Sequence, residues 1–211
     1  IWDANEKVTE HLREQGHLLL AERFMHSYPH DWRSKTPVIF RATEQWFVGV
    51  DEPTKRDEKS LRQLALDSID GIQFFPEWGR NRFRGMLESR PDWCLSRQRA
   101  WGLPIPAFRD ANGAVLMTGA SVRAVSAVFG EKGSDAWFAC TPAELLAGWD
   151  ASSDPEAPAD LDVGTLEKTY DIFDVWMESG SSWNAVMRAR DIGYPIDLYL
   201  EGSDQHRGWF Q

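Results

Sequence analysis

Asp197-Leu-Tyr-Leu-Glu-Gly-Ser-Asp-Gln-His-Arg-Gly-Trp-Phe-Gln211 is the stretch that best predicts the fold of this 211-residue chain. An apolar run from Ile196 to Leu200 changes abruptly into polar residues and two glycines. The pattern predicts a buried parallel strand that leads through a loop into a helix. In open α/β sheets ligands bind beyond the carboxyl ends of such strands. We therefore expect a site presenting Glu201, Asp204, Gln205 and His206. The alternative is an ordinary corner with solvated polar side chains.

The same stretch resembles a known family. Leu200-Glu-Gly-Ser-Asp-Gln-His-Arg-Gly-Trp-Phe210 resembles the strand-to-helix segment in the catalytic domain of isoleucyl-tRNA synthetases, class I enzymes that charge tRNA with isoleucine. Arg90-Pro-Asp-Trp-Cys-Leu-Ser-Arg-Gln-Arg-Ala-Trp-Gly-Leu-Pro-Ile-Pro106 is similar to that family's Asp-Trp-Cys-Ile-Ser-Arg-Gln-Arg segment. Thr169-Tyr-Asp-Ile-Phe-Asp-Val-Trp-Met-Glu-Ser-Gly-Ser-Ser-Trp183 is similar to its Asp-Val-Trp-Phe-Asp-Ser-Gly, with Met177 and Glu178 as conservative departures.

Composition limits the class of protein. The formal net charge of -10 argues against a surface that coats nucleic acid generally, so any tRNA contact would be a local basic patch. Cys94 and Cys140 are the only cysteines, which argues against a thiolate zinc site and favours a reducing cytoplasm. No apolar stretch approaches the length of a membrane span. Because the sequence opens with Ile1 instead of methionine, we expect a piece of a longer protein.

Local patterns predict the elements. Helices are expected at Asp3 to Gly16, Lys59 to Ser68, Arg80 to Arg90, Val122 to Phe129 and from Thr141 onward, where proline takes the first helical position. Strands are expected at His17 to His26, Thr36 to Val48 and, as a strand end, Asp174 to Met177, with Ser179 capping a following helix. Asp110-Ala-Asn-Gly113 is a hairpin turn signal, and Ser152 to Asp160 has the composition of an exposed loop.

The resemblance implies an α+β chain of mixed architecture, a partial Rossmann-type catalytic core with two insertions. Residues 1–35 look like the tail of the editing insertion and residues 36–106 the return to the catalytic core. Residues 107–169 look like the second connective insertion, a small α+β subdomain, and residues 170–211 a strand, loop and helix of the core. The last strand would lack several of its Rossmann neighbours.

The resemblance also assigns site residues. Trp176 and Trp209 match the two tryptophans that wall the isoleucine side-chain pocket. The residues matching the isoleucyl-adenylate site are Glu201, Gly202, Asp204 and Gln205. Without the resemblance, the tryptophans would be interpreted as core and the carboxylates as loop or helix caps.

Two basic clusters and one histidine cluster have competing interpretations. Arg97, Arg99 and Trp101 offer planar cations and a stacking face for tRNA, or alternatively ion pairs and core packing. The arginines between Arg80 and Arg90 are interpreted as a solvated helix face. His26, His30 and Asp31 are interpreted as hydrogen-bonding loop residues, not metal ligands. The family has cysteine where this chain has Asp31, and no zinc site is expected.

The resemblance implies that the parent protein is a cytoplasmic, monomeric isoleucine–tRNA ligase that uses L-isoleucine, ATP with Mg²⁺, and tRNA(Ile). The family's ATP-binding signatures, His-Ile-Gly-His and Lys-Met-Ser-Lys-Ser, do not occur in this sequence. We therefore expect these 211 residues to be catalytically silent alone, to bind no cofactor, and to lack editing activity. The alternatives are a sister valyl- or leucyl-tRNA synthetase and a non-catalytic RNA-binding module.

Overall fold

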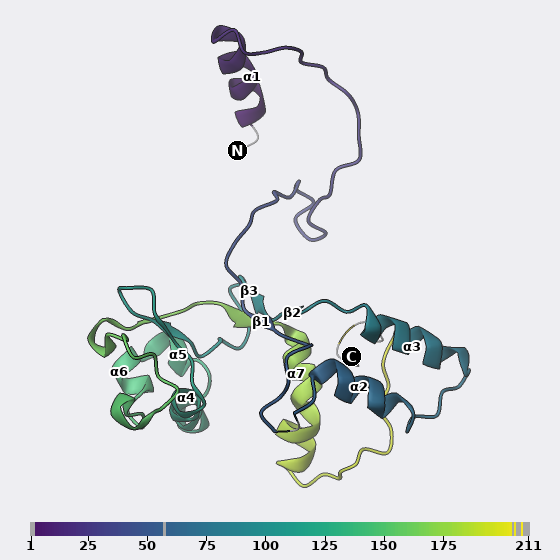
Figure 1. Cartoon of the computed structure of the whole chain (residues 1–211), viewed down its shortest axis with the longest axis vertical. Coiled ribbons are helices and arrows are strands. Elements are labelled where there is room, and N and C mark those ends of the chain that lie inside the picture. The colour runs from purple at the N-terminus through teal and green to yellow at the C-terminus, as the bar shows by residue number, and fades with distance from the viewer. Residues whose placement is uncertain (1–2, 57, 204, 206–207, 209–211) are drawn as a thin grey trace. The chain divides into compact units, whose positions relative to one another are not determined.

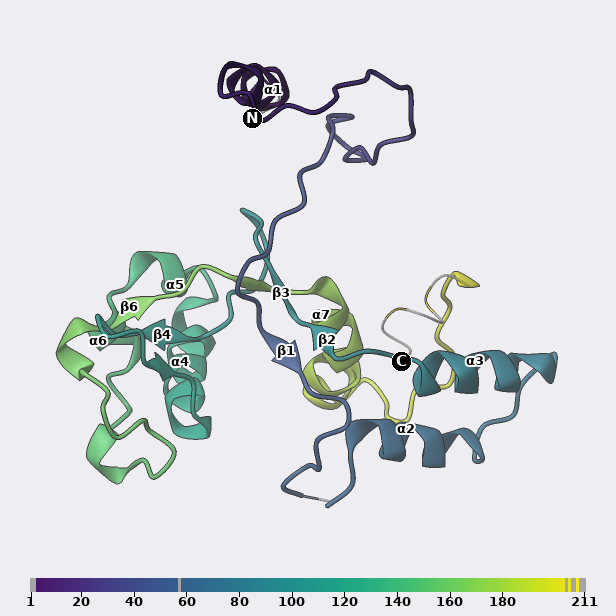
Figure 2. The ribbon, with the colours of Figure 1, turned by 45° about the horizontal axis from the view of Figure 1, so that its top comes forward.

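The computed structural model describes residues 3–56, 58–203, 205 and 208. The chain divides into two compact units, residues 1–43 and 44–211, which are described separately. Figures 1 and 2 label their elements. Mixed helices and small sheets make an α+β chain, as predicted. No described helix combines the length and apolarity that crossing a bilayer requires.

The first unit contains one helix, α1 (Ala4–Glu14), among its described residues. This confirms the predicted helix, and Gly16 follows its end with a φ of 69°, a conformation that glycine adopts without strain. Asp3 occupies the N-cap position but its side chain makes no capping hydrogen bond. The strand predicted at His17 to His26 is wrong, because these residues pair with no described strand and Leu19 is fully exposed.

The second unit contains short antiparallel sheets. Strand β1 (Phe47–Val48) pairs with β2 (Trp93–Cys94), and β3 (Ser96–Arg97) pairs with β7 (Ile172–Phe173). Strand β4 (Phe108–Arg109) lies between β5 (Val115–Leu116) and β6 (Glu167–Lys168). The hairpin predicted at Asp110 to Gly113 is confirmed by the β4–β5 pair. Of the strand predicted from Thr36 to Val48, only β1 and an isolated bridge between His30 and Pro37 form.

The helices of the second unit include those predicted from the sequence. They are α2 (Leu61–Ile69), α3 (Trp78–Glu88), α4 (Gly119–Lys132), α5 (Ala136–Ala139), α6 (Pro142–Leu145) and α7 (Val175–Ser182), followed by a π-helix, η3 (Trp183–Arg188). Two 3₁₀ turns, η1 (Ala151–Ser153) and η2 (Val163–Thr165), lie between α6 and β6. The Ser60 side chain caps α2 and the Thr141 side chain caps α6.

A cluster of buried hydrophobic residues lies within residues 107–169. Trp137 and Phe108 are fully buried with ring centroids 5.0 Å apart, and Leu116, Val125 and Leu145 belong to the same cluster. The predicted exposed loop at Ser152 to Asp160 is wrong at one residue, since the Asp154 side chain is buried. Three donors hold its carboxylate, as described below, and they explain why a charge can be buried there.

Two predictions about the last forty residues are wrong. Ile196 to Leu200 forms no strand, and Leu198 and Leu200 are 71% and 80% exposed. No other described strand pairs with this run, and an isolated strand cannot satisfy its backbone groups. Asp174 to Met177 is not a strand end either, because β7 stops at Phe173 and Asp174 is the N-cap of α7. The predicted cap at Ser179 lies inside that helix.

Candidate functional site

A cavity of about 310 Å³ is the candidate site. Its walls come from α2, the end of α3, β2 and the helix pair α7 and η3, whose arrangement Figure 2 shows. The described lining is predominantly apolar: Val50, Leu61, Ala65, Leu87, Trp93, Trp176, Met177 and Trp183, with Arg62, Arg90, Gly180, Ser181 and Gly208. Such a lining suits an apolar side chain of a ligand.

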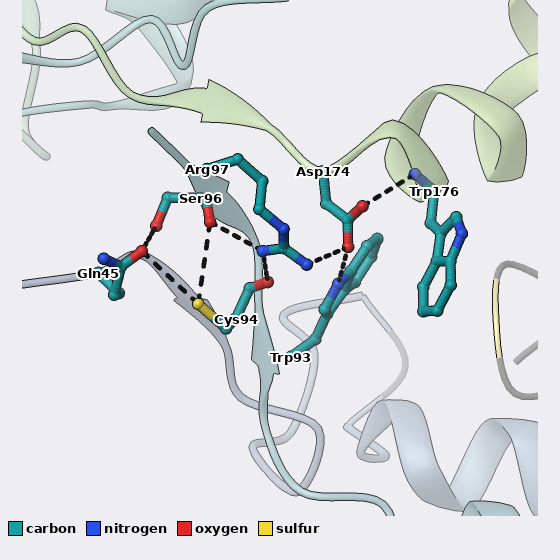
Figure 3. Close-up of polar contacts among 7 residues, drawn as sticks. All are labelled: Gln45, Trp93, Cys94, Ser96, Arg97, Asp174 and Trp176. Carbon is teal, nitrogen blue, oxygen red and sulfur yellow. Dashed lines mark hydrogen bonds and ion pairs between the residues drawn. The ribbon is translucent and has the colours of Figure 1, made fainter. Parts of the chain in front are cut away.

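Asp174 forms hydrogen bonds with two tryptophans that line the cavity (Figure 3). Its Oδ2 accepts hydrogen bonds from Trp93 Nε1 at 3.1 Å and from Arg97 Nη2 at 2.7 Å, and its Oδ1 accepts from the Trp176 backbone N–H at 3.3 Å. The Asp174 side chain is only 8% exposed. A buried carboxylate is stable here because three donors replace water, one of them a cation.

The segment that carries Trp93 and Arg97 is also fixed by amides. Gln45 Oε1 accepts from Ser96 Oγ at 2.8 Å and from Gln98 Nε2 at 3.1 Å, and Gln98 Nε2 also donates to Asp171 Oδ1 at 2.9 Å. Cys94 Sγ lies 3.7 Å from the same Gln45 oxygen. These contacts join the residues just before β1 to β2, to β3 and to the residue just before β7.

Arg62 fastens α2 to the end of α3. Its guanidinium contacts the Asp51 carboxylate at 2.7 and 2.9 Å and donates to the carbonyls of Leu87, Glu88 and Arg90. The Arg62 hydrogen bond lowers the pKa of Asp51. Burial lowers the pKa of Arg90, the second cation in the lining, and the nearby Asp174 charge acts in the opposite direction. Arg62 therefore has a structural task at this wall.

Gly208 approaches Trp176 closely. A Cβ at Gly208 would lie 2.7 Å from Gln205 Oε1 and 3.2 Å from Cε2 and Cζ2 of the Trp176 indole. The Gln205 side chain could move away from such a methyl group, but the Trp176 indole would have to shift by a few tenths of an ångström. The structure thus brings Trp176, Gln205 and Gly208 together, although they come from opposite ends of the last forty residues.

The other predicted substrate-site residues divide into two groups. Glu201 and Gly202 are exposed and are not among the described residues that line the cavity. Asp204, His206 and Trp209 lie outside the described residues.

The three predicted tRNA contacts, Arg97, Arg99 and Trp101, differ in their exposure. Arg97 is turned inward: besides Asp174, its Nη1 donates to the carbonyls of Cys94 and Ser96 at 2.7 and 2.8 Å. Arg99 and Trp101 are exposed, and the Trp101 side chain is 91% exposed. The loop that carries them returns through Gly102, where a Cβ would lie 2.5 Å from Ile172 Cδ1. Of the three predicted contacts, Arg99 and Trp101 are the two that this structure presents to a partner.

The histidine cluster has the predicted loop hydrogen bonds. Nδ1 of His30 lies 2.8 Å from the Tyr28 carbonyl oxygen, and Asp31 Oδ1 accepts from the backbone N–H groups of Arg33 and Ser34. Within the described residues, no three His, Cys, Asp or Glu side chains gather as a metal-binding group.

The arginines of α3 do more than face solvent. Arg80 donates to the carbonyls of Ile69 and Ile72, and Arg84 contacts the Asp70 carboxylate. The predicted solvated helix face therefore also caps the end of α2.

Sequence reasoning missed two residues of this site, Asp174 and Trp93. One signal was available: aspartate is among the best N-cap residues, and Asp174 directly precedes a run compatible with a helix. The contact between Trp93 and Asp174 spans 81 positions and had no local signal.

Comparisons with known proteins place the chain in a family. The sequence model described as tRNA synthetases class I (I, L, M and V) matches residues 4–211. The chain therefore belongs to the class I tRNA synthetases.

The curated relatives that the chain matches are named isoleucine–tRNA ligases. The isoleucine–tRNA ligases of a Nitratiruptor species and a Sulfurovum species are 49% and 47% identical over all of this chain, and that of Microcystis aeruginosa is 48% identical over 99% of it. The chain spans 22%, 22% and 20% of the length of these relatives, respectively.

Proposed function

We propose that this chain forms part of an isoleucine–tRNA ligase, a synthetase that activates L-isoleucine with ATP and transfers it to tRNA(Ile). The observation that carries the proposal is the apolar cavity walled by Trp93 and Trp176, in a chain whose relatives bear that enzyme's name. A rigid indole wall fits a branched aliphatic side chain. Such a wall discriminates weakly against a side chain one methylene smaller, by about 1–3 kcal/mol, and isoleucine activation is itself the standard illustration of this limit in enzymology.

The residues of the chain then have separate tasks. Trp176 and Trp209 wall the isoleucine side chain, and Glu201, Gly202, Asp204 and Gln205 contact the isoleucyl-adenylate. Asp204 would accept from an ammonium group or ribose hydroxyls, and Gln205 can both donate and accept. Catalysis at such a site consists mainly of holding the carboxylate of the amino acid against the α-phosphate.

We propose that the residues lining this cavity do not hold the phosphates of ATP or their Mg²⁺, and that other residues of the enzyme do so. Its described lining is mainly apolar, and the donors of Arg62 already contact Asp51 and three carbonyls. This supports the expectation that the 211 residues alone catalyse no ATP–pyrophosphate exchange. Exchange above background by the purified chain would contradict it.

The proposed assignment of segments follows the same resemblance. Residues 1–35 form the tail of the editing insertion, 36–106 return to the catalytic core, 107–169 form the second connective insertion and 170–211 belong to the core. We further propose a monomeric, cytoplasmic enzyme.

Arg99 and Trp101 are the proposed tRNA contacts in this chain. Both are exposed on an anchored loop, whereas Arg97 is occupied by Asp174 and two carbonyls. In the 211-residue chain, Arg99→Ala is expected to lower the affinity for tRNA. It should also reduce the dependence of that affinity on salt concentration, because one phosphate contact is lost. Fluorescence titration at several salt concentrations measures both quantities, and an unchanged affinity and slope would contradict the assignment.

The test of the proposed function is a chimera. In the Nitratiruptor isoleucine–tRNA ligase, this chain replaces the aligned segment, and ATP–pyrophosphate exchange is measured with isoleucine, valine and leucine. We expect exchange to be fastest with isoleucine and to exceed that with valine by about two orders of magnitude. Preference for valine or leucine, or a soluble folded chimera without exchange, would contradict the proposal.

A further inference from the structure

The resemblance to the synthetase family assigned no role to Asp174, but its contacts indicate one. Its carboxylate is the junction of three segments: β2 through Trp93, β3 through Arg97 and the start of α7 through the Trp176 amide. Two of these partners, Trp93 and Trp176, line the cavity. We infer that Asp174 is a positioning residue that sets two of the three described indoles of the pocket wall, those of Trp93 and Trp176. The inference rests on the proposed function for its catalytic consequence only.

The backbone around Asp174 makes this junction rigid. The Asp174 N–H donates to the Leu95 carbonyl at 2.7 Å, and the Phe173 N–H donates to the Leu103 carbonyl at 2.8 Å. The carboxylate therefore starts from a fixed backbone position. Figure 3 shows the two indoles beside it, with the Trp93 nitrogen pointing at the carboxylate.

Arg97 completes the junction. Its guanidinium supplies the positive charge that a buried carboxylate requires, and its other terminal nitrogen contacts two carbonyls of the segment that carries Trp93. Arg97 thus links the orientation of Asp174 to the position of β2.

Asparagine cannot replace this carboxylate. Both oxygens of Asp174 accept, Oδ2 from two side-chain donors and Oδ1 from a backbone donor. An amide has one accepting oxygen and one donating nitrogen, so in either orientation its NH₂ group faces another donor. Asp174→Asn keeps the size of the side chain and removes the arrangement of acceptors.

The chain offers a matched control in Asp154. This buried carboxylate also accepts from an indole and a second side chain at Oδ2, Trp149 Nε1 at 2.8 Å and Thr118 Oγ1. Its Oδ1 likewise accepts from the backbone N–H two positions on, that of Glu156 at 3.0 Å. Neither Asp154 nor these donors are among the described residues that line the cavity. In Asp154→Asn the amide NH₂ therefore faces either the Trp149 indole N–H or the Glu156 backbone N–H, the same kind of conflict away from the site.

The first arm of the test uses the 211-residue chain with ¹⁵N-labelled tryptophan. Spectra then report the Trp93 and Trp149 indole N–H groups and the Trp176 backbone amide, assigned by Trp→Phe variants. Asp174→Asn is expected to shift the Trp93 indole and Trp176 amide signals and to leave the Trp149 indole signal in place. Asp154→Asn is expected to do the reverse. Unmoved Trp93 and Trp176 signals in Asp174→Asn would overturn the positioning role.

The second arm uses the chimera and measures isoleucine-dependent exchange. Asp174→Asn is expected to raise KM for isoleucine by about tenfold or more, with kcat within about threefold, because the wall contributes to ground-state and transition-state binding alike. Asp154→Asn is expected to change neither constant. An unchanged KM in Asp174→Asn, or an equal rise in Asp154→Asn, would overturn the inference.

A second variant and the tryptophan spectra cover two cases, a misfolded Asp174→Asn variant and an inactive chimera. If Asp174→Asn fails to fold, Trp93→Phe tests the same wall by removing only the indole N–H and part of the ring, and a KM that stays at the wild-type value overturns the role of Trp93. If the wild-type chimera shows no isoleucine-dependent exchange, the proposed function fails, and the tryptophan spectra still decide whether Asp174 positions the two indoles.

Discussion

The block at residues 107–169 and the final segment at residues 196–208 belong to one compact unit but differ in packing. In the block, Trp137 and Phe108 are fully buried. Its β4–β5 hairpin and its capped helix α6 are each formed by residues that are near one another in the sequence. In the final segment, Leu198 and Leu200 are mostly exposed and form no strand. The difference shows that an apolar run becomes a strand only where another segment completes its hydrogen bonds.

The largest expected effect lies in the block. Trp137→Ala removes a fully buried indole and the hydrogen bond from its Nε1 to the Thr169 carbonyl, and we expect it to lower the free energy of unfolding by about 3–5 kcal/mol. Leu198→Ala, which truncates a side chain that is 71% exposed, is expected to change it by less than about 0.5 kcal/mol. Urea unfolding of both variants measures the contrast. Equal losses would show that the final segment is packed as tightly as the block.

Acid is expected to destabilise the block. Hydrogen bonds from Thr118 and Trp149 lower the pKa of Asp154, and the Asp162 backbone N–H lowers the pKa of Asp110. A carboxyl group with a lower pKa in the folded state stabilises that state above its unfolded pKa, near 3.8, and loses this contribution as pH falls through the folded pKa. Thermal unfolding from pH 7 to about pH 3 should show a falling midpoint, with a shallower fall in Asp154→Asn. A midpoint independent of pH would contradict this.

Gly208→Ala tests the close approach of Gly208 to the Trp176 indole. The added methyl group meets Gln205 and the Trp176 indole, and we expect a loss of about 1–3 kcal/mol from overpacking. Urea unfolding measures the loss, and the Trp176 backbone amide signal should shift. Wild-type stability together with an unmoved signal would mean that Gly208 and Trp176 do not approach each other.

The smallest expected effect has the opposite sign. Gly130 lies inside α4, and a Cβ there would meet no atom within 4 Å. Gly130→Ala should stabilise the chain by about 0.5–1 kcal/mol, because alanine restricts the unfolded chain and favours a helix. It also serves as the matched glycine control for Gly208. A loss of stability on urea unfolding would contradict the open surroundings of this position.

Elements with local signals were predictable from the sequence. The helix start at Thr141 and Pro142 and the turn at Asp110 to Gly113 involve residues within a few positions of one another. The strands predicted at His17 to His26 and Ile196 to Leu200 were wrong because strand formation depends on a distant partner.

The candidate site was predictable only in part. Trp176 was named from the resemblance to the synthetase family, and the structure places it in the wall of the cavity. The contacts of Asp174 with Trp93 and Arg97 span 81 and 77 positions of the chain, so they had to come from the structure.

The central claim is that the cavity beside Trp176 receives the isoleucine side chain. The most direct measurement is KM for isoleucine in ATP–pyrophosphate exchange by the chimera carrying Trp176→Ala, compared with the unmodified chimera. Because the indole supplies a large apolar wall, we expect a rise in KM of about tenfold or more with a smaller change in kcat. A KM equal to that of the unmodified chimera would contradict it.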